Sequence, residues 1–170
     1  MKTIYFVFPI YLTLFSLAIA QEPNLTLTSS AFENDQFIPS DYTCSGTDIN
    51  PPLAIKNIPV HTKSLLLVVH DPDAPRGNWT HWVVYGIKPD TKFIAENSIP
   101  GNELLNDFGN FHYSGPCPPD GKPHHYVFDL YALDTKFSTN EGARLKNLLI
   151  KIQGHILDKT QLIGVYRKFS

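Results

Sequence analysis

The segment Leu65–Pro75 reads LLLVVHDPDAP and joins a short apolar run to a proline-rich turn. The five consecutive apolar residues Leu65–Val69 have the length of a strand. An unbroken run of this kind predicts a strand buried on both faces, with a piece of buried helix as the alternative. Asp71 and Pro72 end the run, because a residue that precedes proline is steered away from the helical region. The segment therefore predicts a central strand that leads into a stiff polar loop.

Further strands are predicted on both sides of this segment, because apolar, aromatic and β-branched residues recur there with strand-like patterns. They are an edge strand at Asn24–Ser30, two core strands at His81–Ile87 and Tyr126–Leu133, and a last strand at Leu162–Tyr166. Gly86 is expected to weaken the end of its strand. The Gly- and Asn-rich stretch 99–115 predicts a long surface loop.

The helical signals lie near the C-terminus. Ser138–Glu141 has the pattern of a capping box, with the Glu three residues after the Ser. Apolar residues follow at helical spacing between Leu145 and Ile152, and Gly154 could end that helix. A short second helical turn is expected before Leu162. Several strands followed by one helix predict a mainly β protein, a β-sandwich with a peripheral C-terminal helix.

Residues 1–20 have the pattern of a signal peptide. Lys2 supplies an early positive charge, an uncharged apolar run extends from Ile4 to Ala20, and small residues close the run. A membrane anchor is the alternative, but a proline interrupts the run and an acidic residue follows it. We therefore expect cleavage after Ala20. The remaining residues, 21–170, are expected to form a single domain that is exported to the periplasm or secreted.

The charge of the chain excludes one class of partner. Lys and Arg number 14 and Asp and Glu number 16, which gives a formal net charge of −2 at pH 7. Loss of Lys2 with the leader would change this value to −3, that is, −2 − 1. No basic tail or stripe is present, so nucleic acid is not an expected partner.

Two cysteines, Cys44 and Cys117, would remain in the exported protein. An even number of cysteines in an oxidising compartment favours a disulfide. Two free thiols are one alternative. The other is a nucleophilic Cys117, because His112 and His124 lie near it in the sequence.

A second polar segment, Tyr113–Tyr126, also ends in an apolar strand and carries several prolines. Polar groups on stiff loops beside rigid strands are typical of binding sites. An Asp/His/Tyr cluster from the two segments could bind phosphate or a phosphomonoester, because His and Tyr donate hydrogen bonds and an Asp can orient a His. The alternative is structural: Asp71 and Asp73 would cap turns, and His70 would be a satisfied core residue.

Other chemistries have weaker support in the sequence. The His and Asp spacings match no common zinc pattern, and a hard cation would need more oxygen ligands in one stretch, so no metal and no cofactor are expected. A Gly-x-Ser-x-Gly nucleophile elbow is absent from the sequence. We therefore do not expect an enzyme, and hydrolase activity is the weakest of the functions considered.

The two polar segments resemble the signatures of the phosphatidylethanolamine-binding protein family, also called the Raf kinase inhibitor protein family. Asp71–Pro75 with His81 is similar to the first signature, and Gly115–Tyr126 is similar to the second. The stretches Tyr42–Cys44 and Asn50–Leu53 resemble the bacterial YbhB/YbcL branch of that family.

The resemblance implies a β-sandwich of antiparallel sheets with a small anion-binding pocket at one end. The residues it implies for the pocket are Asp71, His81, His124 and Tyr126, with Trp79, Gly115 and Pro116 as walls. It also implies a cis bond between Ala74 and Pro75. His125 stands where the family commonly has Arg, which removes a permanent charge and makes any ion pair at that position uncertain.

The function implied is that of a binding or regulatory module for a small anion: phosphate, a phosphomonoester or a phospholipid head group. Membrane contact is expected at most through such a head group. The alternative is a protein-interaction module resembling a protease inhibitor, since some family members inhibit a serine carboxypeptidase. Kinase inhibition is not expected, because an exported protein would not meet a cytosolic kinase.

Overall fold

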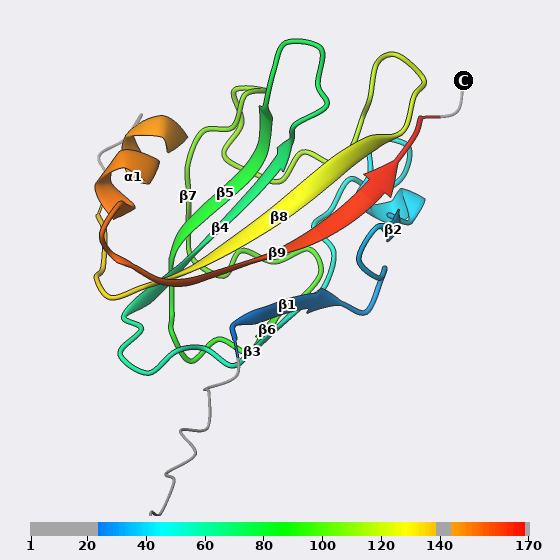
Figure 1. The fold of residues 1–170 in the computed structure, drawn as a ribbon. Coiled ribbons are helices and arrows are strands. Elements are labelled where there is room, and N and C mark those ends of the chain that lie inside the picture. The colour runs from blue at the N-terminus through cyan, green and yellow to red at the C-terminus, as the bar shows by residue number, and fades with distance from the viewer. Residues whose placement is uncertain (1–23, 139–143, 169–170) are drawn as a thin grey trace, which may run out of the picture.

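The computed structural model describes residues 24–138 and 144–168, and its strands form two layers (Figure 1). One sheet has six strands in the order β2-β9-β8-β4-β5-β7, and the other has three in the order β1-β3-β6. The strands are β1 Thr26–Ser29, β2 Gln36–Phe37, β3 Leu53–Lys56, β4 Ser64–Asp71, β5 Trp79–Ile87, β6 Phe93–Ile94, β7 Asn102–Glu103, β8 His124–Leu133 and β9 Ile156–Tyr166. A short 3-10 helix, η1, covers Ser40–Tyr42, and one α-helix, α1, covers Leu145–Ile152. The mainly β sandwich with a C-terminal helix is confirmed.

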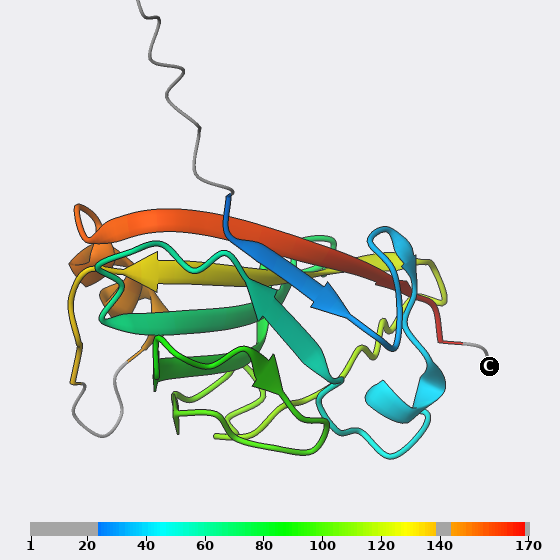
Figure 2. The ribbon, with the colours of Figure 1, turned by 90° about the horizontal axis from the view of Figure 1, so that it is seen from below.

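Strand β4 lies in the middle of the six-stranded sheet and is buried on both faces, as its apolar run predicts. Leu65, Leu67 and Val69 face the core between the sheets, where side chains of β1, β3 and β6 meet them. Leu66 and Val68 face the other way, into a smaller core under α1. Figure 2 shows the three-stranded sheet lying across one face of the longer strands. Both faces of β4 are covered, and this explains why the run Leu65–Val69 is apolar without interruption.

The sheets are antiparallel as expected, except for one pair of strands. Strand β2 pairs in parallel with β9, with Gln36 opposite Gly164. The parallel pairing is possible because a long stretch of chain separates the two strands, so no tight turn has to join them. Gly164 permits the close approach, since a Cβ at that position would overlap the side chains of Ile38 and Phe32.

Helix α1 begins at Leu145 after Arg144, and no side chain caps its N-terminus. The expected capping box extends into residues 139–143, which lie outside the described residues. Gly154 adopts φ +91° just after the helix, which confirms it as the residue that ends the helix. The expected second helical turn before Leu162 is wrong, because β9 already begins at Ile156 and pairs along β8.

Two bulges in β5 decide where its side chains point. Opposite Val69 and His70 of β4 stand Trp82 and Thr80, so His81 is an extra residue in β5. Such a bulge re-aims side chains, and here it lets His81 and its neighbour Trp82 both turn to the inner side of the sheet. The second bulge contains Gly86, at φ +68°, so this glycine bends the strand as well as interrupting its side-chain pattern.

The stretch 99–115 is less exposed than the sequence predicts, because it includes β7 and a buried asparagine. The Asn106 side chain donates to the backbone carbonyls of His81 and His112, and its Oδ1 accepts from the backbone N–H groups of Phe108 and Asn110. The loop is therefore fixed to β5 by Asn106, and also by Asp107, whose Oδ2 accepts from the N–H of Thr80. Among the described residues, no helix has the length and apolar character needed to cross a membrane. The expected leader, residues 1–20, lies outside them.

Candidate functional site

A cavity of about 360 Å³ opens where β4 ends and β5 begins. The loop between these strands and the loop before β8 project from the same end of the sheet (Figure 1). Asp71 and His81 form the floor of the cavity, and each is 3% exposed. The other residues that line the cavity are Ala74, Pro75, Arg76, Trp79, Phe108, Cys117 and Pro119. Three of the seven residues expected in the pocket, Asp71, Trp79 and His81, therefore line it directly.

His124 stands behind the floor and holds Asp71. Its Nδ1 lies 2.7 Å from Oδ2 of Asp71, and its Nε2 lies 3.2 Å from Oδ1 of Asp120. Burial alone would lower the pKa of His124, but the hydrogen bonds and charges of Asp71 and Asp120 outweigh burial and raise it. Because both ring nitrogens face carboxylate oxygens, the imidazolium form fits this position. The positive charge of His124 then offsets the negative charge of Asp71.

Asp71 also shapes the loop that follows it, since its Oδ1 accepts a hydrogen bond from the backbone N–H of Asp73. Asp73 in turn accepts from the backbone N–H and from Nδ1 of His125, at 2.8 and 2.7 Å. These bonds, the backbone one first, lower the pKa of the Asp73 carboxyl group. Asp71 therefore caps the turn, as the structural alternative holds, and it also lines the cavity. His125 keeps a partner for Asp73 where the family commonly has Arg.

His81 reaches the cavity with one ring nitrogen already engaged. Its Nδ1 lies 2.5 Å from the carbonyl oxygen of Ser114, and a carbonyl only accepts, so Nδ1 carries the hydrogen. Nε2 is then the nitrogen left for a ligand. Burial lowers the pKa of His81 more than the Ser114 carbonyl and the Asp71 carboxylate raise it. In neutral His81, Nε2 is therefore a hydrogen-bond acceptor, and it can donate to an anion only after it gains a proton. This refines the expectation that His81 donates to the ligand.

Tyr126 is fully buried beside the floor, with its ring edge-on to His81 at 5.2 Å between ring centroids. Its hydroxyl makes no hydrogen bond of standard geometry to the described residues, but it lies near enough to Asp71 and to the backbone of Cys117 for both to influence its pKa. Burial, followed by the nearby Asp71 charge, raises the pKa of Tyr126 far above its ordinary value, so the hydroxyl keeps its proton. A buried hydroxyl beside a carboxylate is a hydrogen-bond donor at the floor of the cavity.

Arg76 is the site residue that sequence reasoning missed. It is exposed on the rim of the cavity, and the described part of the chain offers its guanidinium no ion pair or hydrogen bond. Its signal was its position directly after the Asp71–Pro75 motif. Phe108 was also missed, and nothing in the local sequence marks it, because the fold of the Asn106 loop brings it to the cavity.

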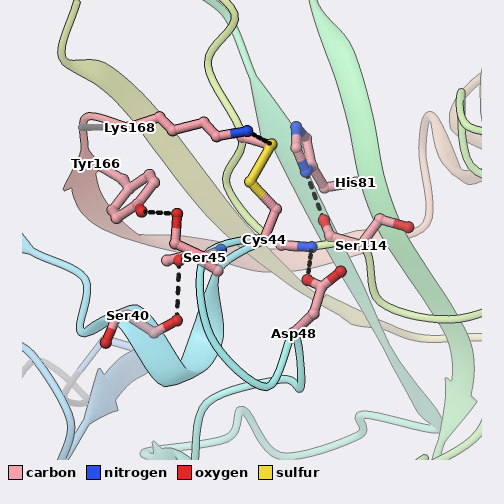
Figure 3. Close-up of a disulfide and its surroundings, with 11 residues drawn as sticks. Ser40, Cys44, Ser45, Asp48, His81, Ser114, Tyr166 and Lys168 are labelled. Atoms are coloured by element: carbon pink, nitrogen blue, oxygen red, sulfur yellow. Dashed lines mark hydrogen bonds between the residues drawn. A yellow bond between two sulfur atoms is a disulfide. The ribbon is translucent and has the colours of Figure 1, made fainter. Parts of the chain in front are cut away.

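Gly115 and Pro116 do not line the cavity as expected but join two loops behind it. The N–H of Gly115 donates to Oδ1 of Asp48 at 2.6 Å, and the carbonyl of Pro116 accepts from the N–H of Cys44 at 3.2 Å. Figure 3 shows how these loops meet beside the disulfide. Both residues are buried, and they contribute to the site by holding their neighbours Ser114 and Cys117 in position.

The disulfide between Cys44 and Cys117 is confirmed, with a Cα–Cα distance of 5.5 Å (Figure 3). Neither sulfur is a free thiol, so the alternatives of free cysteines and of a nucleophilic Cys117 are wrong. Cys117 lines the cavity, which means that the disulfide ties one wall of the site to the segment after η1.

The expectation of a cis bond between Ala74 and Pro75 is wrong, because the described residues contain no cis peptide bond. The N–H of Gly77 donates to the carbonyl of Ala74, which closes a four-residue turn with Pro75 at its second position. A trans proline is favoured at that position, whereas a cis proline belongs at the third.

His70 lies outside the site, as the structural alternative holds. It points away from the core between the sheets, with Nε2 3.2 Å from Asp129 and Nδ1 2.6 Å from Oδ1 of Asn78. Asp129 also pairs with Lys159 at 3.0 Å. In the described ranges, His, Cys, Asp and Glu side chains form no group of three or more suited to a metal ion.

A two-layer β-sandwich with a cavity at one end defines the structural class of this protein. The sequence profile of the phosphatidylethanolamine-binding protein family matches residues 28–167. The chain belongs to that family, which confirms the resemblance seen in its two polar segments.

Relatives and solved structures agree with this assignment. A UPF0098 protein of Pyrococcus horikoshii is 44% identical over 150 residues, which cover 82% of this chain and 75% of the relative. A UPF0098 protein of Methanothermobacter thermautotrophicus is 43% identical, and the match covers 85% of this chain and 99% of the relative. A phosphatidylethanolamine-binding protein homologue from Chlamydia trachomatis superposes with a TM-score of 0.82 at 41% identity, over 86% of this chain and 99% of that one. The structure of Escherichia coli YbcL superposes with a TM-score of 0.79 at 26% sequence identity, over 86% of this chain and 100% of YbcL.

Proposed function

We propose that this protein is an exported binding or regulatory module that holds a small anion on the floor of the cavity. The observation that carries the proposal is the floor of the cavity, where the buried His81 has Nδ1 engaged by Ser114 and Nε2 left for a ligand, and where the buried Tyr126 ring packs against His81. Arg76 adds a permanent positive charge at the rim. The negative charge of Asp71 is already met by His124 and by the N–H of Asp73, so it opposes an anion less than a free carboxylate would.

Phosphate, a phosphomonoester and a phospholipid head group all fit this arrangement of donors. Binding without catalysis is proposed because the described site offers no activated nucleophile: Cys117 is in a disulfide, and the buried Ser114 hydroxyl is bonded to Asn106. Export is supported by the leader-like N-terminal sequence and by a disulfide of the kind that oxidising compartments maintain.

Replacement of His81 by Ala is expected to weaken phosphate binding by about 10- to 100-fold, because one charge-assisted hydrogen bond is lost. Phosphorus NMR titration of the mature protein with phosphate and phosphoethanolamine measures this change. His112→Ala is the matched control, since His112 is exposed and lies outside the cavity. Equal affinities in the wild-type protein and the His81→Ala variant would overturn the proposed site.

Binding of sulfate is expected to strengthen as the pH falls, because sulfate only accepts hydrogen bonds and Nε2 of His81 donates only when protonated. The pKa of free His81 is lowered, so binding must draw in a proton, and the affinity should fall by up to about tenfold per pH unit above that pKa. Calorimetry between about pH 5 and 8 covers the range in which histidines titrate, while sulfate keeps its charge.

His81→Gln is the control for this pH dependence. Asp71, Arg76 and His124 are common to both proteins, so any slope that they cause persists in the variant, and only the part due to His81 disappears. An identical pH dependence in the two proteins would show that His81 does not take up the proton.

A further inference from the structure

Two short loops form the end of the sandwich that lies opposite the cavity. The loop between β3 and β4 turns at Pro59–Thr62, where the N–H of Thr62 donates to the carbonyl of Pro59. The loop between β5 and β6 turns at Lys88–Thr91, where the N–H of Thr91 donates to the carbonyl of Lys88. Figure 1 shows both loops at the end where β1 begins, whereas the loop between β4 and β5 projects from the other end.

Lysines surround a hollow of about 610 Å³ between these loops. Four lysines lie in segments 56–63 and 88–92: Lys56, Lys63, Lys88 and Lys92. All four side chains are exposed, and none forms an ion pair with any residue that the structure describes. Asp90 is the one acidic residue in the two segments, so together they carry a charge of +3 in a chain whose net charge is −2.

The neighbouring segments do not cancel this charge. Asp134 and Lys136 follow β8 at the same end, and their charges offset each other. Asp158, beside the start of β1, accepts a hydrogen bond from the N–H of Leu25. With Asp158 counted, an excess of +2 remains at this end.

Two apolar side chains stand in solvent beside the lysines. Val60, at the tip of the first turn, is 75% exposed, and Phe93, which follows Lys92, is 59% exposed. Apolar side chains placed among lysines suit the interface of a membrane, because they enter the head-group layer while the ammonium groups reach the phosphates. A soluble polyanion would pair with the lysines but leave Val60 and Phe93 in water.

The N-terminal part of the chain joins the domain at this end. Nδ2 of Asn57 donates to the carbonyl of Asn24 at 3.2 Å, which holds the start of β1 beside the first loop. Residues 21–23 separate Asn24 from the apolar run Ile4–Ala20, and three residues span at most about 11 Å. While that run lies in a membrane, as a signal peptide does before cleavage, this end of the domain is held close to the membrane surface.

We propose that the end formed by segments 56–63 and 88–92, called the basic end below, docks on an anionic lipid surface. Its lysines contact lipid phosphates, and Val60 and Phe93 enter the head-group layer. This contact goes beyond the head-group contact expected from the sequence, and it does not rest on the proposed function. The eight residues of β4 separate the basic end from the cavity by about 25 Å.

The negative net charge of the chain does not prevent this contact. The Debye length is about 10 Å in 0.1 M salt, so acidic residues at the far end of the molecule are screened from the membrane. The local excess at the basic end then decides the interaction, and each lysine near an anionic surface is expected to strengthen binding about fivefold.

Cosedimentation of the mature protein with lipid vesicles in about 0.1 M salt tests the contact. Vesicles of equal parts phosphatidylglycerol and phosphatidylcholine are expected to bind the protein at least about tenfold more tightly than vesicles of phosphatidylcholine alone. Replacement of the four lysines of the basic end by Gln is expected to weaken this binding by more than about 100-fold. Val60→Ser is expected to weaken it about fivefold, because less apolar surface enters the head-group layer.

The matched control removes four lysines from other parts of the surface. Gln replaces four exposed residues in this variant: Lys122, Lys146, Lys151 and Lys168. The net charge changes by the same amount as in the basic-end variant, but vesicle binding should stay within about twofold of the wild-type value.

Four results would overturn the proposal. Failure to bind either kind of vesicle, or equal binding to both, would exclude an anionic lipid surface as the partner. Equal losses in the two fourfold variants would show that net charge, rather than the basic end, attracts the protein. Loss of vesicle binding in His81→Ala would place the contact at the cavity. Binding to poly-glutamate without binding to vesicles would assign the basic end to an acidic protein.

Discussion

Reduction of the disulfide between Cys44 and Cys117 is expected to lower the free energy of unfolding by about 4 kcal/mol, because the bond closes a long loop in the unfolded chain. The two cysteines are separated by 73 positions. The folded loops should stay together without the bond, since the Tyr113 hydroxyl still donates to the carbonyl of Tyr42 and the Tyr166 hydroxyl to Ser45. The loss therefore arises mainly from the greater freedom of the unfolded state.

Urea unfolding with and without a reductant, followed by tryptophan fluorescence, measures this loss, because Trp82 lies in the core. The Cys44→Ala/Cys117→Ala double variant is the control and should unfold identically in both conditions. A change below about 1 kcal/mol in the wild-type protein would contradict the expected role of the bond.

Gly115→Ala is expected to destabilise the protein by about 3 kcal/mol, the upper part of the usual range for overpacking a well-packed interior. A Cβ on this residue would lie 2.6 Å from the carbonyl oxygen of Tyr42, 2.9 Å from Cα of Thr43 and 2.5 Å from Oδ1 of Asp48. Two of these atoms belong to backbone that the adjacent disulfide holds in place, so the clash cannot be relieved by a side-chain rotation. Thermal or urea unfolding of the variant measures the effect.

Gly109→Ala separates this steric cost from the conformational cost of replacing a glycine. Gly109 has φ +81° and open space around it, so its replacement should cost about 1 kcal/mol for backbone conformation alone. The Gly115 variant should also bind phosphate more weakly, because a displaced Ser114 carbonyl no longer orients His81. Equal losses of stability in the two variants would show that Gly115 is not required for close packing.

The central features of the fold follow from local sequence, whereas its irregular features do not. The run Leu65–Val69 predicts β4 because burial on both faces leaves a continuous apolar signal. The start of β9 at Ile156 was missed because pairing with β8, rather than the residues of β9 themselves, extends that strand. The parallel pairing of β2 depends on contacts between segments that are distant in the sequence, and no local pattern reports such contacts.

The same division applies to the site. Asp71 and His81 carry signals because they stand in short motifs next to apolar strands. That His81 and Trp82 both turn to the inner side could not be read from the alternation of residues, since a bulge shifts that alternation by one. Phe108 has ordinary surroundings in the sequence, and its loop brings it to the cavity only in the folded chain. Arg76 directly follows the Asp71–Pro75 motif, but only the folded turn shows that it lies at the rim of the cavity.

Because of the hydrogen bonds of Asn106, the loop that follows it can change in sequence while the floor of the cavity keeps its structure. This buried side chain bonds to both ends of the loop, while residues 108–111 between them are largely in solvent. Replacements at the tip of the loop can therefore alter the surface offered to a ligand without moving the floor of the cavity. The rim of the cavity can in this way be reshaped by a few changes in this loop, while the β-sandwich and its buried acid and histidines stay the same.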